Sequence, residues 1–120
     1  MIEQLIALAM LLWPTPAISV DVEPGECLGG AASCTIGATQ GVDCKIYTSP
    51  GFENYSDEGK ISILAHEIGH CLGIMGDGQD FYGHRPVCLM NHALLGKPNN
   101  WDFTMLRQSR PYPYQKRVSY

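Results

Sequence analysis

The sequence pattern at 57–72 predicts an amphipathic helix that carries two histidines. This helix constrains the fold of the 120-residue chain more than any other feature. Apolar residues recur in the segment at spacings of three and four, the period of a helix with one face on a core. They are Ile61, Leu64, Ala65, Ile68 and Leu72. Ser56 precedes the segment as a candidate N-cap, and Gly73 follows it as a natural terminator. The candidate site therefore lies on a helix near the middle of the chain.

The predicted helix carries His66, Glu67 and His70. Four residues of helix advance by about 400°, so both imidazoles project from nearly the same side and can bind one cation. Glu67 lies about 100° around the helix from His66, where its carboxylate can reach a water beside the cation without binding the cation itself. Zinc lowers the pKa of a water bound to it. A nearby carboxylate can then accept the proton of that water as the water attacks a carbonyl, which is the arrangement for metal-assisted hydrolysis. Without a metal, the histidines would be a locally hydrogen-bonded pair and Glu67 a solvated helix acid.

This segment resembles the metzincin zinc peptidases, whose long motif H-E-x-x-H-x-x-G-x-x-H is followed by a methionine turn. His66, Glu67, His70 and Gly73 match the motif, and Met90 stands at a suitable distance for the turn, in a context similar to the small matrixins. The resemblance implies a zinc-dependent endopeptidase with Zn²⁺ as cofactor and a peptide or protein as substrate. It also implies that Glu67 is the general base and that Met90 forms the floor of the site.

The third zinc ligand of the motif falls on Gly76, which has no side chain to offer. Catalytic zinc is ordinarily held by three protein ligands, so another residue has to serve. His84 is chemically the best candidate in the same loop. Asp77 is the nearest in sequence, and some metzincins use an aspartate as the third ligand. An aspartate just after the third-ligand position also resembles the sequence pattern of the adamalysin branch. Asp80 and His92 are the remaining candidates.

Five cysteines favour an oxidising compartment and leave at least one thiol outside any bridge within the chain. They stand at positions 27, 34, 44, 71 and 88. The first three lie in a glycine-rich region where bridges could be local, but the spacing does not select one connectivity. We therefore expect a secreted or extracellular protein with disulfides.

The run Leu5–Trp13 contains nine consecutive apolar residues and is followed by Pro14-Thr15-Pro16. Nine residues at about 1.5 Å each cannot cross a bilayer of ~30 Å as a helix, so a stable membrane anchor is not expected. The run is either a secretory leader or a retained apolar arm that packs on another surface. Glu3 stands where a leader ordinarily carries a positive charge.

We predict three parts: a possible signal peptide or retained apolar arm at 1–19, a metzincin-like zinc domain at 20–109, and an extended basic, tyrosine-rich and proline-rich tail at 110–120. The fold class is α+β. The expected domain has a short antiparallel sheet, a zinc-binding active-site helix, a methionine turn and a C-terminal helix. Only 65 residues precede His66, which leaves room for two or three strands and none for a backing helix. The domain is therefore expected to be a minimal or truncated metzincin.

Two segments, 34–39 and 42–48, alternate in the manner of strands on either side of a turn and predict a hairpin. By resemblance, the strand at 42–48 would lie at the sheet edge and align an extended substrate by strand addition. Residues 21–33 are rich in Gly, Glu and Pro and predict irregular surface chain. The C-terminal helix is expected to begin near Asn99 or Asn100 and to end near Gln108.

A formal net charge of −4 argues against a nucleic-acid partner. Besides the endopeptidase, the sequence allows a second function: a structural or interaction protein, such as a component of a virion or other assembly, in which zinc staples a metzincin-derived core. His66, His70, Asp77 and His84 would suffice for such a closed four-ligand site. The N-terminal arm and the tail at 110–120 would then contact neighbouring subunits.

Overall fold

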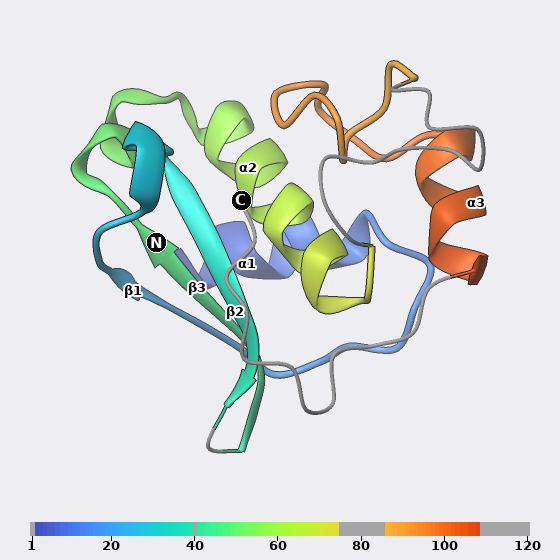
Figure 1. Ribbon diagram of the computed structural model, residues 1–120, viewed down its shortest axis with the longest axis horizontal. Helices are drawn as coiled ribbons and strands as arrows, with labels where there is room; N and C mark the ends of the chain where they lie inside the picture. Colours follow the sequence, from blue (N-terminus) through green and yellow to red (C-terminus); the bar gives the residue numbers. More distant parts are fainter. Residues whose placement is uncertain (1, 40, 75–85, 109–120) are drawn as a thin grey trace.

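Helix α2 (Asp57–Cys71) runs through the middle of the fold, with the sheet on one side and helix α3 on the other (Figure 1). The computed structural model describes residues 2–39, 41–74 and 86–108. These residues form a small α+β domain with a three-stranded sheet and three α-helices. In chain order the elements are α1 (Ile2–Leu11), β1 (Val20–Pro24), β2 (Ser33–Thr39), β3 (Val42–Thr48), α2 and α3 (Asn100–Gln108), with short 3₁₀ segments at Leu28–Gly30 and Pro50–Asn54.

Local signals account for the boundaries of α2 and α3. The hydroxyl of Ser56 accepts a hydrogen bond from the backbone N–H of Gly59 at 3.2 Å, and so caps α2. Gly73 follows the helix with a φ of 108°, a left-handed conformation that glycine adopts without strain. The side chain of Asn99 accepts from the N–H of Trp101 at 3.0 Å at the start of α3. The helices predicted at 57–72 and near 99–108 are confirmed to within about one residue.

The sheet is mixed rather than antiparallel, with the strand order β1-β3-β2. The predicted hairpin is present, because β2 pairs antiparallel with β3. The prediction of irregular chain at 21–33 is wrong for residues 21–24, because strand β1 (Val20–Pro24) pairs parallel with β3. β3 is consequently the central strand, so the expectation that 42–48 forms an edge is also wrong; the edges are β1 and β2.

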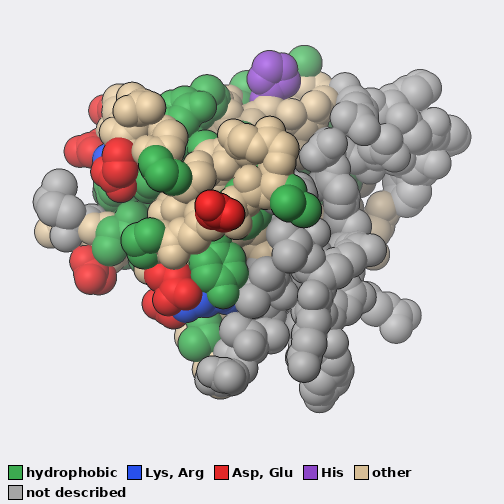
Figure 2. Space-filling model, turned by 60° about the vertical axis from the view of Figure 1, so that its left-hand side comes forward, with side chains coloured by type: hydrophobic (Ala, Val, Ile, Leu, Met, Phe, Trp, Pro, Cys, Tyr) green, Lys and Arg blue, Asp and Glu red, His purple; other side chains and the backbone are tan. Residues whose placement is uncertain are grey.

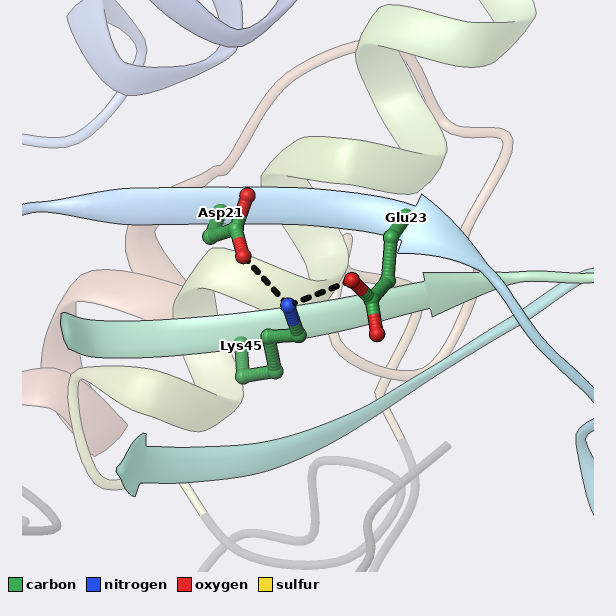
Figure 3. Close-up of polar contacts among 3 residues, drawn as sticks. All are labelled: Asp21, Glu23 and Lys45. Carbon is green, nitrogen blue, oxygen red and sulfur yellow. Dashed lines mark hydrogen bonds and ion pairs between the residues drawn. The ribbon is translucent and has the colours of Figure 1, made fainter. Parts of the chain in front are cut away.

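Side-chain alternation explains why β1 joins the sheet despite its acidic composition. Val20 and Val22 pack against the core, whereas Asp21 and Glu23 point to the other face. There both carboxylates contact Lys45 of β3 (Figure 3), with Glu23 Oε2 3.0 Å from Lys45 Nζ. These hydrogen bonds raise the pKa of Lys45, with the Asp21 bond contributing most. Opposite charges across neighbouring strands therefore favour this register.

The apolar run near the N-terminus forms helix α1, which packs against α2. Leu5 and Ala9 of α1 are buried, as is Trp13 just beyond it. The indole Nε1 of Trp13 donates a hydrogen bond to the carbonyl of Ala65 in α2 at 2.9 Å. The expectation that no helix would pack behind the site is therefore wrong, because the apolar segment itself supplies one.

The core lies between α2, the sheet and α1. All residues of α2 from Ser62 to Cys71 are buried, so this half of the helix touches protein on every side. The largest wholly buried apolar side chains are Phe52, Ile46, Leu64, Ile68, Leu89 and Met90.

Acidic side chains are prominent on the face shown in Figure 2, where little basic surface is seen. Among the helices of the described residues, none has the length and apolar character needed to cross a membrane.

Candidate metal centre

His66 and His70 meet inside the fold as predicted from their spacing. The two Nε2 atoms lie 3.1 Å apart, and the rings stand nearly perpendicular at 88°, with 4.7 Å between centroids. His66 is 4% exposed and His70 is wholly buried. The buried half of α2 therefore presents two convergent ring nitrogens to one point.

Backbone carbonyls determine which ring nitrogens face each other. His66 Nδ1 lies 2.9 Å from the carbonyl oxygen of Leu89, and His70 Nδ1 lies 2.9 Å from that of Ile74. A carbonyl oxygen can only accept, so each Nδ1 must carry a proton and donate it. In a neutral ring with its proton on Nδ1, Nε2 is the nitrogen that can bind a metal cation.

The geometry of the pair fits zinc. Two imidazoles bound to tetrahedral zinc at about 2.0–2.1 Å have nitrogens about 3.3 Å apart. The observed Nε2 separation of 3.1 Å is within reach of that value. Zinc-binding histidines ordinarily donate the other ring N–H to a carbonyl or carboxylate, as both rings do here. The two histidines are therefore candidates for two of the ligands that a zinc site needs.

The turn that orients His66 is anchored by Asp102, near the start of α3. Its carboxylate accepts from the N–H of Leu89 at 2.8 Å and from that of Met90 at 2.9 Å, and it is wholly buried. It also accepts from the N–H of Asn99 at 2.9 Å. Because the carbonyl of Leu89 holds His66, this carboxylate sets the position of a candidate ligand through the intervening turn.

Met90 packs against α2, and its predicted role as the floor of a metal site stays a prediction. It is wholly buried, and a Cβ atom built on Gly69 would overlap its sulfur. The same Cβ would come within 2.8 Å of Trp13 Cζ2. Gly69, between the two histidines in the sequence, therefore allows Met90 and Trp13 to approach the helix backbone directly.

Glu67 points toward β2 and is 1% exposed. Its Oε2 accepts from the hydroxyl of Ser33 and its Oε1 from that of Thr35, both at 2.6 Å. Burial raises the pKa of the Glu67 carboxyl, while the nearby His66 and the two hydroxyl donors offset part of that rise. A carboxylate with a raised pKa is better matched to accept and return a proton near neutrality.

A pocket of about 370 Å³ opens beside Glu67. Residues at the start of β2, two positions of α2 and the chain after Met90 line it. These lining residues are Ala31, Ala32, Ser33, Tyr55, Ile63, Glu67, Asn91, His92, Ala93 and Leu94. The pocket is large enough for an amino-acid side chain, and Ser33 of edge strand β2 lines it.

Three of the four candidate third ligands, Asp77, Asp80 and His84, lie outside the described residues, as does Gly76. His92 is exposed and lines the pocket beside Glu67. Within residues 2–39, 41–74 and 86–108, no group of three or more His, Cys, Asp or Glu side chains is placed to hold one ion. The choice between His84 and Asp77 therefore stays a prediction.

Four of the five cysteines form two disulfides. Cys27–Cys34 closes a local loop ahead of β2, and Cys44–Cys71 links β3 to the last residue of α2, next to His70. Cys88 is a buried thiol, and burial and the nearby Asp102 raise its pKa to about 11. Disulfides are consistent with a secreted protein.

Sequence reasoning missed Ser33, Thr35 and Asp102. Ser33 and Thr35 are two apart in β2, which places both side chains on one face of a strand. That spacing was visible in the sequence, but nothing local indicated that this face would meet Glu67. Asp102 stands in the first turn of α3, where an acid is common for helix capping alone.

No protein-family model, curated protein or solved structure matches this chain.

Proposed function

We propose that the chain is a secreted zinc-dependent endopeptidase with a minimal metzincin-like site. The observation that carries the proposal is the convergence of the two Nε2 atoms, which lie 3.1 Å apart, with each Nδ1 atom 2.9 Å from a backbone carbonyl oxygen. This is the preparation that a histidine pair needs to bind zinc. The third ligand is assigned, from the sequence, to His84, with Asp77 as the alternative.

Zinc at this position would supply Lewis acidity, which lowers the pKa of water and polarises a peptide carbonyl. Glu67 accepts the proton that the attacking water loses and returns it to the leaving amine. His66 and His70 keep their orientation because the carbonyls of Leu89 and Ile74 hold their Nδ1 atoms.

Edge strand β2 is the element that would align the substrate. Its outer edge is free of a neighbouring strand in the described sheet, and its first residue lines the pocket beside Glu67. An extended peptide paired with β2 would place one side chain in that pocket and a peptide bond near the carboxylate. The substrate-aligning role expected for 42–48 therefore passes to Ser33–Thr39.

The near-complete burial of Glu67 favours a second candidate function. Both of its carboxyl oxygens accept hydrogen bonds from hydroxyl groups of β2, and the side chain is only 1% exposed. A buried polar side chain with these contacts can serve simply to hold α2 against the sheet. In that case zinc would be a folding staple in a structural or interaction protein, and α1 and the tail at 110–120 would contact partners in an assembly.

Metal analysis combined with a peptidase assay separates the two functions. We expect the wild-type chain to bind one zinc and to cleave a peptide library, and Glu67→Gln to keep the zinc while losing activity by at least about 100-fold. Glu58→Gln, an exposed acid at the start of α2, is the matched control and should retain full activity. Equal activity of wild type and Glu67→Gln would exclude the catalytic role.

The ligand assignment has its own test. His66→Ala should abolish stoichiometric zinc binding, and His84→Ala should weaken it more than Asp77→Ala. A wild-type chain that binds zinc tightly but cleaves nothing would support the structural function instead.

A further inference from the structure

Strand β2 contributes two hydroxyl groups to one carboxylate, that of Glu67. Ser33 Oγ lies 2.6 Å from Oε2 and Thr35 Oγ1 lies 2.6 Å from Oε1, so each oxygen has its own donor. All three side chains are buried, at 5%, 0% and 1% exposure. Both distances are at the short end of the range for hydrogen bonds between oxygen atoms.

The two donors fix the carboxylate plane, not only its position. A single donor would leave the terminal torsion of Glu67 free to rotate, and that torsion is intrinsically broad. Donors on both oxygens restrict this rotation. The carboxylate has about four acceptor sites, so the two bonds leave capacity for a water or a leaving amine.

The strand that carries the hydroxyls is itself well anchored. Ser33 pairs with Thr48 and Thr35 with Ile46 across the β2–β3 ladder. Cys34, which lies between them, is bonded to Cys27. The hydroxyls are therefore presented from a restrained element, as accurate positioning of a reacting group requires.

We propose that Ser33 and Thr35 are positioning residues that hold the Glu67 carboxylate in the orientation its proton transfers require. The proposal rests on the endopeptidase function and adds the residues that aim its base. Because Ser33 and Thr35 belong to the edge strand proposed to align the substrate, the same strand orients both the peptide and the base that acts on it.

Two substitutions remove the hydroxyls with little change in shape: Ser33→Ala and Thr35→Val. Their matched controls, Ser33→Thr and Thr35→Ser, retain a hydroxyl at each position. We expect each hydroxyl-free variant of the zinc-loaded chain to lose about 10-fold in kcat with KM within about two-fold, and the double variant to lose about 100-fold. The controls should stay within about three-fold of wild type. A merely structural role would lower stability in thermal unfolding without this split between kcat and KM.

Crystal structures of the wild type and of the Ser33→Ala, Thr35→Val double variant provide a readout that is independent of activity. We expect the Glu67 carboxylate to leave its wild-type orientation when both hydroxyls are absent. An unchanged carboxylate, or an unchanged kcat in the double variant, would overturn the proposal. Absence of activity in the wild type would instead overturn the proposed endopeptidase function, and the structures would still decide whether the hydroxyls orient Glu67.

Discussion

The sulfur of Met90 lies so close to Gly69 that helix α2 has no room for a side chain at that position. The contact joins the turn at Met90 to the helix segment between His66 and His70. It therefore determines how closely Met90 approaches the backbone between the two histidines.

Gly69→Ala should destabilise the protein. The added methyl group would overlap Met90 and press on Trp13, and overpacking of this kind costs about 1–3 kcal/mol. That cost opposes the gain of about 1 kcal/mol in helix propensity, so we expect a net loss in urea unfolding. Gly59→Ala, in the first turn of the same helix, meets mainly the exposed Tyr55 side chain and serves as control. Equal stability of the two variants would contradict the close packing of Met90.

Asp102→Asn should weaken both the fold and zinc binding. The Asp102 side chain is buried and accepts hydrogen bonds from three backbone N–H groups. The substitution replaces one of its acceptor oxygens by an NH₂ donor. We expect a loss of about 2–4 kcal/mol in unfolding free energy. Zinc affinity should fall by about 10-fold or more, because the Leu89 carbonyl that orients His66 loses its anchor. Asp21→Asn, at the exposed Lys45 pair, should leave zinc affinity unchanged in competition with a chelator.

The contribution of Asp43 to stability should depend on pH. Hydrogen bonds from the backbone N–H and hydroxyl of Ser19 lower the pKa of Asp43 below its ordinary value of 3.8. A lowered folded-state pKa means that the contribution is present above pH 3.8 and is lost as the pH falls through the lower, folded value. Asp43→Asn should therefore be less stable than wild type at pH 6, and the difference should shrink below pH 3.8. A difference that is constant across this range in chemical unfolding would show that the carboxylate is not the cause.

Cys88 should resist alkylation in the folded protein. It is wholly buried, and its pKa of about 11 leaves little thiolate at pH 8. Iodoacetamide should add slowly to the native chain, and mass spectrometry should find one label after unfolding without reductant. The reduced and unfolded chain should accept five labels, one for each cysteine. Rapid labelling of the native chain, or three labels without reductant, would contradict the buried thiol or the disulfide pairing.

Local sequence patterns predicted much of the helix that carries the site. The boundaries of α2, the hairpin of β2 and β3, and α3 all follow from residues near one another in the chain, such as Ser56 and Gly73. The convergence of His66 and His70 was also predictable from local sequence, because a spacing of four residues in a helix places both rings on one side whatever surrounds them.

Long-range packing decided the rest. The alternation of Val20 and Val22 was visible, but only pairing with β3 made the segment a strand and moved the sheet edge to β2. The five cysteines allowed several connectivities, and the pairing followed from which elements met in space.

The chemical state of the candidate site is a tertiary property as well. The sequence by itself determines that two imidazoles and a carboxylate share a helix. Which ring nitrogen of His66 faces His70 depends on the carbonyl of Leu89, 23 residues from His66. The orientation of Glu67 depends on hydroxyls more than 30 residues away. Helical geometry is set by neighbours in the chain, whereas protonation and orientation are set by whichever donors and acceptors the fold brings into contact.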